Sequence, residues 1–348
     1  MVTPLLSSDD LRQARDLIEA SGLAFETRYH DLVGIFQSGR IVAVGAREGR
    51  VLKMLAVAKD LQGGTLLDEV VTALVGLGFQ AGLDSFFVFT APGQATSFEA
   101  LNFNLLASSG KSALLEYGDG LRRYLARHQK VVTPGDNGAV VANCNPFTLG
   151  HRYLIEQAAS RVERLYLFVV REEGSLFPFE QRLQMVREGT CDLPRVTLLD
   201  TSCYAVSSVT FPTYFLKDGD PGGAIQMELD LLLFAGRIAP HFHIKTRFVG
   251  SEPLSRTTAS YNQAMHRVLP PLGVAVTELE RIGAPGAAIS ASLVREQLAR
   301  GETSGLRGRN AGYPAPPAQS RTCGFPASGS SVVLASAQGA AFKHIFVD

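Results

Sequence analysis

The chain has 348 residues, which at about 150 residues per domain is enough for two domains. Lysine plus arginine and aspartate plus glutamate each number 33, so no overall charge attracts nucleic acid or an anionic membrane surface. The N-terminus lacks a signal pattern, and the four cysteines include no Cys-x-x-Cys pair, which argues against a zinc site or a disulfide framework. These features predict a soluble, cytoplasmic protein.

The first third of the chain has the pattern of an α+β domain. Apolar residues at helical spacing predict a helix from Ser8 to Ala20, with Ser8 as its N-cap. Short apolar segments separated by polar turns then predict an antiparallel meander. The strands expected are at 32–36, 41–45 and 52–57, followed by a helix at 66–77 and a strand at 86–89.

A polar, turn-rich stretch between Arg127 and Asn137 predicts a boundary between a first domain at 1–133 and a second at 138–302. In the second domain, apolar runs alternate with helical segments, which is typical of a doubly wound parallel sheet. We expect strands at 138–141, 165–170, 196–199 and 245–249, and helices at 179–188, 260–267 and 292–300. Residues 303–348 are rich in Ala, Gly, Ser and Pro without a sustained period, and predict an irregular tail.

The strongest functional signal is the segment from Asn143 to His151, which follows the first expected strand of the second domain and opens a helix. The N-terminus of a helix offers unpaired backbone N–H groups and a partial positive charge, both of which favour phosphate. Gly150 lets the backbone approach a ligand closely. Cys144 has no base placed beside it, so we expect it to pack rather than to react.

Two further segments have the same setting at the end of a strand. In Ala288 to Arg295, Ser292 starts the expected helix, and Arg295 lies three residues later on the same face. An arginine there supplies a fork of donors for phosphate oxygens. The turn Gly250-Ser251-Glu252 follows the strand expected at 245–249.

These motifs resemble those of the nucleotidyltransferase superfamily, namely its (H/T)xGH motif at 148–151 and its ISxSxxR motif at 289–295. The resemblance implies transfer of AMP from ATP without a protein nucleophile. It implies Mg²⁺ as cofactor together with ATP, and no metal-binding residues in the protein itself. It implies that the catalytic residues are Thr148, His151, Ser292 and Arg295. It implies ATP contacts from Asn143, Asn145, Pro146, Phe147, Gly150, Gly250, Glu252, Ile289 and Ser290.

The motifs alone fit phosphate and carboxylate acceptors equally well, but longer segments resemble the citrate lyase ligases. These segments are 143–158, 175–182, 207–217 and 249–262, and the likeness extends over about residues 11–300. The resemblance implies that acetate and ATP form acetyl-AMP, and that the acetyl group passes to the citrate lyase acyl-carrier subunit. The acceptor there is the thiol of a phosphopantetheine-derived prosthetic group, and the by-products are AMP and pyrophosphate.

The same resemblance implies a first domain of the GCN5-related acetyltransferase type. Residues 55–65 resemble the pyrophosphate loop of those enzymes, which makes Gln62, Gly63 and Gly64 candidate pantetheine-binding residues. Thr65 stands where Gly or Ala is usual, and Asn102 stands where Gly is common. A purely structural or carrier-docking role for this domain therefore stays open.

Other functions also stay open. The second domain alone would suit a pantetheine-phosphate or mononucleotide adenylyltransferase, and the first domain alone would suit an acetyl-CoA-dependent acetyltransferase. An inactive carrier-binding module is a non-catalytic alternative. His241 and His243 lack a third ligand nearby in the sequence, so we do not expect a metal site there.

Overall fold

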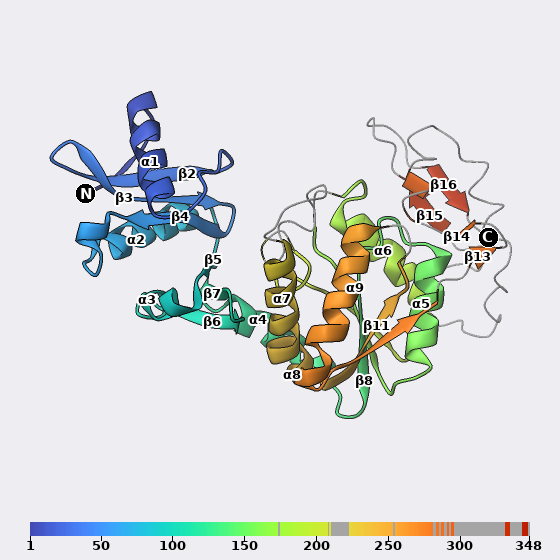
Figure 1. The fold of residues 1–348 in the computed structure, drawn as a ribbon. Helices are drawn as coiled ribbons and strands as arrows, with labels where there is room; N and C mark the ends of the chain where they lie inside the picture. The colour runs from blue at the N-terminus through green and yellow to red at the C-terminus, as the bar shows by residue number, and fades with distance from the viewer. Residues whose placement is uncertain are drawn as a thin grey trace. The chain divides into compact units, whose positions relative to one another are not determined.

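In a computed structural model, the protein forms two compact units, Met1–Ala126 and Arg127–Asp348, and each has its own sheet (Figure 1). The structure describes residues 1–172, 175–207, 209, 223–252, 255–280, 283–284, 287–288, 291, 294–295, 331–334 and 343–346.

Unit 1 contains a seven-stranded sheet in the order β1-β2-β3-β4-β5-β7-β6. Its strands are β1 (Val2–Pro4), β2 (Asp31–Gln37), β3 (Arg40–Glu48), β4 (Val51–Val57), β5 (Phe86–Thr90), β6 (Phe103–Ser108) and β7 (Ala113–Tyr117). Its helices are α1 (Ser8–Ala20), η1 (Lys59–Leu61), α2 (Leu66–Gln80), η2 (Pro92–Gln94), α3 (Ala95–Glu99) and α4 (Gly120–His128), the last of which ends just beyond the unit.

The expected meander is confirmed, because β2, β3 and β4 pair antiparallel in sequence order. The helix α1 has the expected bounds, but its cap is Ser7 rather than Ser8. The hydroxyl oxygen of Ser7 accepts a hydrogen bond from the Asp10 backbone N–H, and the Asp10 carboxylate accepts one from the Ser7 N–H. This reciprocal capping box fixes the start of the helix at Ser8.

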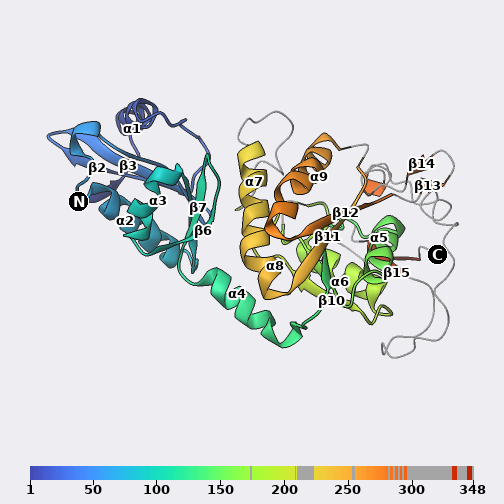
Figure 2. The same cartoon turned by 60° about the horizontal axis from the view of Figure 1, so that its bottom comes forward.

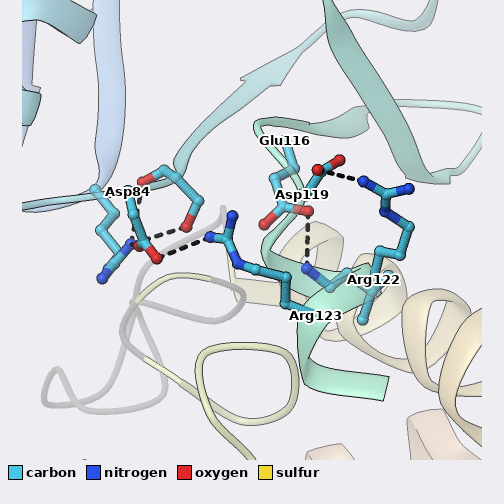
Figure 3. A network of polar contacts seen from close by, with 8 residues as sticks. Asp84, Glu116, Asp119, Arg122 and Arg123 are labelled. Carbon is cyan, nitrogen blue, oxygen red and sulfur yellow. Dashed lines mark hydrogen bonds and ion pairs between the residues drawn. The ribbon is translucent and has the colours of Figure 1, made fainter. Parts of the chain in front are cut away.

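Polar contacts tie α4 to the sheet of unit 1 (Figure 3). The buried carboxylate of Glu116, on β7, accepts a hydrogen bond from the Leu121 N–H in the first turn of the helix. Asp84 accepts hydrogen bonds from Arg50 at 2.6 Å and from Arg123 at 2.8 Å. The chain therefore leaves unit 1 through a helix whose first turns are anchored there.

Unit 2 contains a five-stranded sheet in the order β10-β9-β8-β11-β12, with every neighbouring pair parallel. Its strands are β8 (Asn137–Ala142), β9 (Leu165–Val169), β10 (Val196–Asp200), β11 (Ile244–Gly250) and β12 (Ala275–Leu279). Its helices are η3 (Gln129–Val131), α5 (Leu149–Ala159), α6 (Phe179–Thr190), α7 (Gly223–Leu233), η5 (Phe234–Ile238), α8 (Ala239–His241), α9 (Arg256–Val268) and η6 (Pro270–Leu272).

Alternating side chains of β9 show that both faces of this sheet are covered. Leu165, Leu167 and Val169 join a core with α5 and α6. The rings of Tyr166 and Phe168 point to the other face and contact Phe242, just after α8. Figure 2 shows α7 and α9 side by side over the sheet. The doubly wound fold is therefore confirmed, although the sequence did not predict α7 or β12.

Beyond residue 280, the described strands form two short antiparallel pairs. These are β13 (Gly283–Ala284) with β14 (Ala287–Ala288), and β15 (Ser331–Leu334) with β16 (Lys343–Phe346). Most of the helix expected at 292–300 and of the tail expected at 303–348 lies outside the described residues. In the part of the chain that is described, no helix is both long and apolar enough to span a bilayer.

Candidate nucleotide-binding site

Two of the motif segments, the loops after β8 and β11, lie at the point where the strand order of the unit 2 sheet reverses. The chain passes from β8 to β9 on one side, and β11 pairs with β8 on the other. In open α/β sheets, ligands bind beyond the carboxyl ends of the strands at such a switch point. The loop after β8 carries Asn143 to Thr148, and the loop after β11 carries Ser251 and Glu252.

Thr148 and His151 form a pair at the start of α5. The Nδ1 atom of His151 accepts a hydrogen bond from the Thr148 backbone N–H at 3.1 Å, and it lies 2.8 Å from the Thr148 hydroxyl oxygen. Because a backbone N–H can only donate, Nδ1 is an acceptor, and the neutral imidazole carries its proton on Nε2. The local fold thus makes His151 a hydrogen-bond donor through Nε2.

Phe147 fixes the approach to this pair. Its ring stacks on that of His151, with centroids 5.9 Å apart and planes 20° apart. The ring also lies against Gly189 near the end of α6, where an added Cβ would be 2.3 Å from a ring carbon. The absence of a side chain at residue 189 therefore allows Phe147 to take this position.

Arg295 joins the second motif to the first. Its guanidinium donates a hydrogen bond to the backbone carbonyl of Asn145, 150 residues earlier in the chain. Val294 and Arg295 are helical, whereas Ile289, Ser290 and Ser292 lie outside the described residues. The expected roles of these three residues therefore stay predictions.

The turn after β11 is held by α9. The side-chain amide of Asn262 donates to the Gly250 carbonyl at 3.0 Å. The Glu252 carboxylate accepts a hydrogen bond from the backbone N–H of Ser255, the N-cap of α9. The nearest atom to a Cβ added at Gly250 would be 4.0 Å away, on Leu154, so the backbone at this glycine is open. Contact of Gly250 and Glu252 with adenosine stays a prediction.

Comparison with known proteins identifies the family. Residues 137–308 match the family model described as the citrate lyase ligase C-terminal domain. The chain is 41% identical over 264 residues to the [citrate [pro-3S]-lyase] ligase of Klebsiella pneumoniae, covering 74% of this chain and 77% of that protein. The chain belongs to the citrate lyase ligase family.

Other comparisons agree with this assignment. The [citrate [pro-3S]-lyase] ligase of Escherichia coli K12 is 34% identical over 306 residues, which cover 85% of this chain and 86% of that protein. The chain is also similar, over part of its length, to a solved acetyltransferase. A solved GCN5-related N-acetyltransferase from Rhodopseudomonas palustris matches 34% of this chain and 94% of its own, at 14% identity and a TM-score of 0.28.

In this chain, Cys144 packs in the core as expected. It is only 1% exposed, and burial raises the pKa of its thiol to about 12. A thiol that stays protonated at neutral pH is a poor nucleophile. Among the described residues, no group of three or more His, Cys, Asp or Glu side chains could hold a metal ion.

The loop predicted to bind pantetheine lies between η1 and α2. Gly63 takes a left-handed conformation at φ +83°, and the Gln62 side-chain amide donates to the Val57 carbonyl at 3.3 Å. Asn102, which replaces a common glycine, has φ +65°. Asparagine tolerates this region better than most residues other than glycine. The strand that leads into the loop, β4, pairs with β5 through Val51 and Leu52 and then extends to Val57.

Sequence analysis did not single out Arg182, which is fully buried beneath the loop after β8. A signal was present, because Phe179, Arg182 and Val186 fall on one helical stripe of α6 and all three are buried. A charged residue on an apolar stripe requires buried partners, and the partners of Arg182 include the backbone carbonyl of Asn143 in the motif loop.

Proposed function

We propose that the protein activates acetate with ATP as acetyl-AMP and then acetylates the prosthetic thiol of the citrate lyase acyl-carrier subunit. Relatives that match most of the chain are named as ligases of citrate lyase, which supports this reaction over a pantetheine-phosphate or mononucleotide adenylyltransferase. The observation that supports the proposal is the hydrogen bond from Arg295, a residue of the second motif, to Asn145 in the loop of the first motif. We propose the cytoplasm as its location.

In the first step, an acetate oxygen attacks the α-phosphorus of ATP, a new P–O bond forms, and the P–O bond to pyrophosphate breaks. His151 would donate from Nε2 to the charge that develops on the α-phosphate, and Arg295 would hold the departing pyrophosphate. Thr148 keeps the imidazole oriented through its N–H. Positioning and charge stabilisation are sufficient for this chemistry, so no protein group needs to form a covalent bond.

The side chains around the Thr148–His151 pair suit an anionic nucleotide better than a bare metal ion, because they are a hydroxyl, an imidazole, amides and a guanidinium. Mg²⁺ would therefore be held by the triphosphate oxygens, where it would neutralise part of their charge.

In the second step, the prosthetic sulfur attacks the acetyl carbonyl carbon, and the bond from that carbon to the AMP oxygen breaks. A thioester forms, AMP leaves, and the thiol proton passes to solvent. The atoms balance with acetate, ATP and thiol as reactants, and acetyl thioester, AMP and pyrophosphate as products.

Pyrophosphate exchange tests the first step. Purified protein with Mg²⁺, ATP and labelled pyrophosphate should form labelled ATP only when acetate is present. His151→Ala should slow the exchange by about a hundredfold or more, since it removes a donor to the developing charge. His266→Ala is the matched control, because His266 lies on α9 with 45% of its side chain exposed, beside Glu278. Exchange that does not depend on acetate, or that survives in His151→Ala, would count against the proposal.

We also propose that Gln62, Gly63 and Gly64 hold the pantetheine-derived arm of the carrier during acetyl transfer. Gly64→Leu tests this with little strain, because its Cβ would meet no atom closer than 3.7 Å. Transfer to deacetylated citrate lyase should fall while pyrophosphate exchange is unchanged. Gly93→Leu is the control, since nothing lies within 4 Å of its Cβ position. Unchanged transfer by Gly64→Leu would exclude this role.

A further inference from the structure

The loop that opens the nucleotide site rests on one fully buried arginine. Arg182, on α6, is 0% exposed. Its guanidinium donates to both the backbone carbonyl and the side-chain oxygen of Asn143, at 2.7 and 2.8 Å. It also donates to the carbonyls of Val170 at 2.9 Å, Glu172 at 2.6 Å and Phe177 at 3.0 Å.

These acceptors come from separate parts of the chain. Asn143 follows β8, Val170 follows β9, and Phe177 immediately precedes the N-cap of α6. A buried guanidinium is stable only when its donors are satisfied, so it draws these backbone segments to one point. The loop after β8 is thus fixed relative to the end of the neighbouring strand.

The segment before α6 braces the same loop directly. The side-chain amide of Asn143 donates to the Ser175 hydroxyl oxygen at 3.3 Å. The backbone N–H of Phe177 donates to the side-chain oxygen of Asn145 at 3.1 Å. The loop that carries the first motif is therefore held at both of its asparagines.

The direction of the Asn143 carbonyl has a consequence for anion binding. In a trans peptide, the C=O and the following N–H point in opposite directions. Because Arg182 binds the Asn143 carbonyl, the Cys144 N–H points away from the buried guanidinium. Cys144 has φ +50°, and left-handed residues in such loops help successive N–H groups to form an anion-binding concavity.

We infer that Arg182 is a positioning residue for nucleotide binding, with Ser175 as a second support. It does not touch the nucleotide. It holds the loop from Asn143 to Phe147 so that backbone N–H groups and the Thr148–His151 pair face the triphosphate. The inference rests on the proposed function only in that ATP is the ligand of this site.

Direct binding of α,β-methylene-ATP, measured by calorimetry on the full-length protein, tests this inference. Arg182→Lys keeps a positive charge but cannot reach the same set of acceptors, so the analogue should bind about tenfold or more weakly. Arg47→Lys is the matched control, because Arg47 is also a buried arginine, bonded to Asp31 and Gly49 in unit 1. Both variants should melt at lower temperature, but Arg47→Lys should bind the analogue within about twofold of the unaltered protein. Arg182→Lys binding equally well would overturn the inference.

A second variant covers the case in which Arg182→Lys shows no cooperative unfolding. Ser175→Ala removes only the support at the Asn143 side chain, and should weaken analogue binding by about threefold. Unchanged binding by Ser175→Ala would then overturn the inference.

Kinetics separate positioning from a general loss of structure. In the exchange assay, Arg182→Lys should raise the KM for ATP by about tenfold and leave the KM for acetate within about twofold. Equal increases in both would contradict the inference. If the unaltered protein shows no acetate-dependent exchange, the proposed function fails, but analogue binding still tests the role of Arg182.

Discussion

The guanidinium of Arg295 donates a hydrogen bond to the backbone carbonyl of Asn145, so two segments 150 residues apart meet at one edge of the parallel sheet. An arginine carries several N–H donors in a planar fork, so one side chain can bind more than one acceptor. We expect Arg295, which lies beside the loop after β8, to contact the phosphates of a bound nucleotide.

Replacing this fork with a single ammonium group should impair ATP use. Arg295→Lys should lower kcat/KM for ATP in pyrophosphate exchange by about ten- to a hundredfold, because a bidentate guanidinium contact with phosphate is lost. Arg267→Lys, an exposed position at the end of α9, should leave exchange unchanged. Equal kcat/KM values for Arg295→Lys and the unaltered protein would exclude a phosphate contact.

Adding a single methyl group at Gly189 should disturb the site from a distance. Alanine normally stabilises a helix relative to glycine, but here its Cβ would lie 2.3 Å from the Phe147 ring. The ring must move, and with it the stack on His151. We expect Gly189→Ala to lower the free energy of unfolding by about 1–3 kcal/mol in urea titrations.

The same variant should raise the KM for ATP by about threefold or more, since Phe147 directly precedes Thr148. Gly76→Ala in α2 is the control, because no atom lies within 4 Å of its Cβ position. It should gain up to about 1 kcal/mol of stability. A comparable gain in stability for Gly189→Ala would show that the Phe147 ring can move without destabilising the protein.

The cysteines should differ sharply in reactivity. With its pKa raised to about 12, Cys144 has a thiolate fraction of about 10⁻⁴ at pH 8, and its side chain is buried. Cys191 is exposed. Brief treatment with iodoacetamide, followed by peptide mass spectrometry, should find label on Cys191 and almost none on Cys144 until urea is added. Equal labelling in the native protein would contradict the packing of the motif loop.

The contact between Arg152 and Asp192 predicts a pH dependence of stability. The hydrogen bond from the Arg152 guanidinium lowers the pKa of the Asp192 carboxyl from its usual 3.8. A lowered pKa means that the stabilisation is fully present above the unfolded value and is lost as the pH falls through the lower folded value. Asp192→Asn should therefore cost about 1–3 kcal/mol at pH 7.

Urea unfolding at several pH values checks this prediction. The difference in the free energy of unfolding between the unaltered protein and Asp192→Asn should be constant above about pH 5 and shrink below about pH 4. Asp60→Asn, at an exposed site in η1, should change the stability by less than about 0.5 kcal/mol throughout. A difference in the free energy of unfolding that grows as the pH falls would contradict the stabilising role of this contact.

Much of the fold was predictable because it depends on local patterns. Period-two and period-3.6 spacing of apolar residues gave α1, the meander of β2 to β4, and the alternation of strands and helices from β8 onward. The sequence did not predict β12 and α7. In β12 only Leu279 is buried and the other residues are half-buried or exposed, so its apolar pattern is weak. In α7 the buried stripe includes Asp230, whose carboxylate accepts hydrogen bonds from Val206 and Tyr261.

By itself, the sequence determined that motif residues stand where strands end and helices begin. Both the motifs and the apolar patterns that mark these ends can be recognised from residues adjacent in the chain. Thr148, Gly150 and His151 needed no tertiary information to be singled out. Only the tertiary structure decided that β11 pairs with β8, that Arg295 reaches Asn145, and that Arg182 is buried under Asn143. These relationships join residues far apart in the chain, and they arise from strand order and from the requirement that buried polar groups find partners.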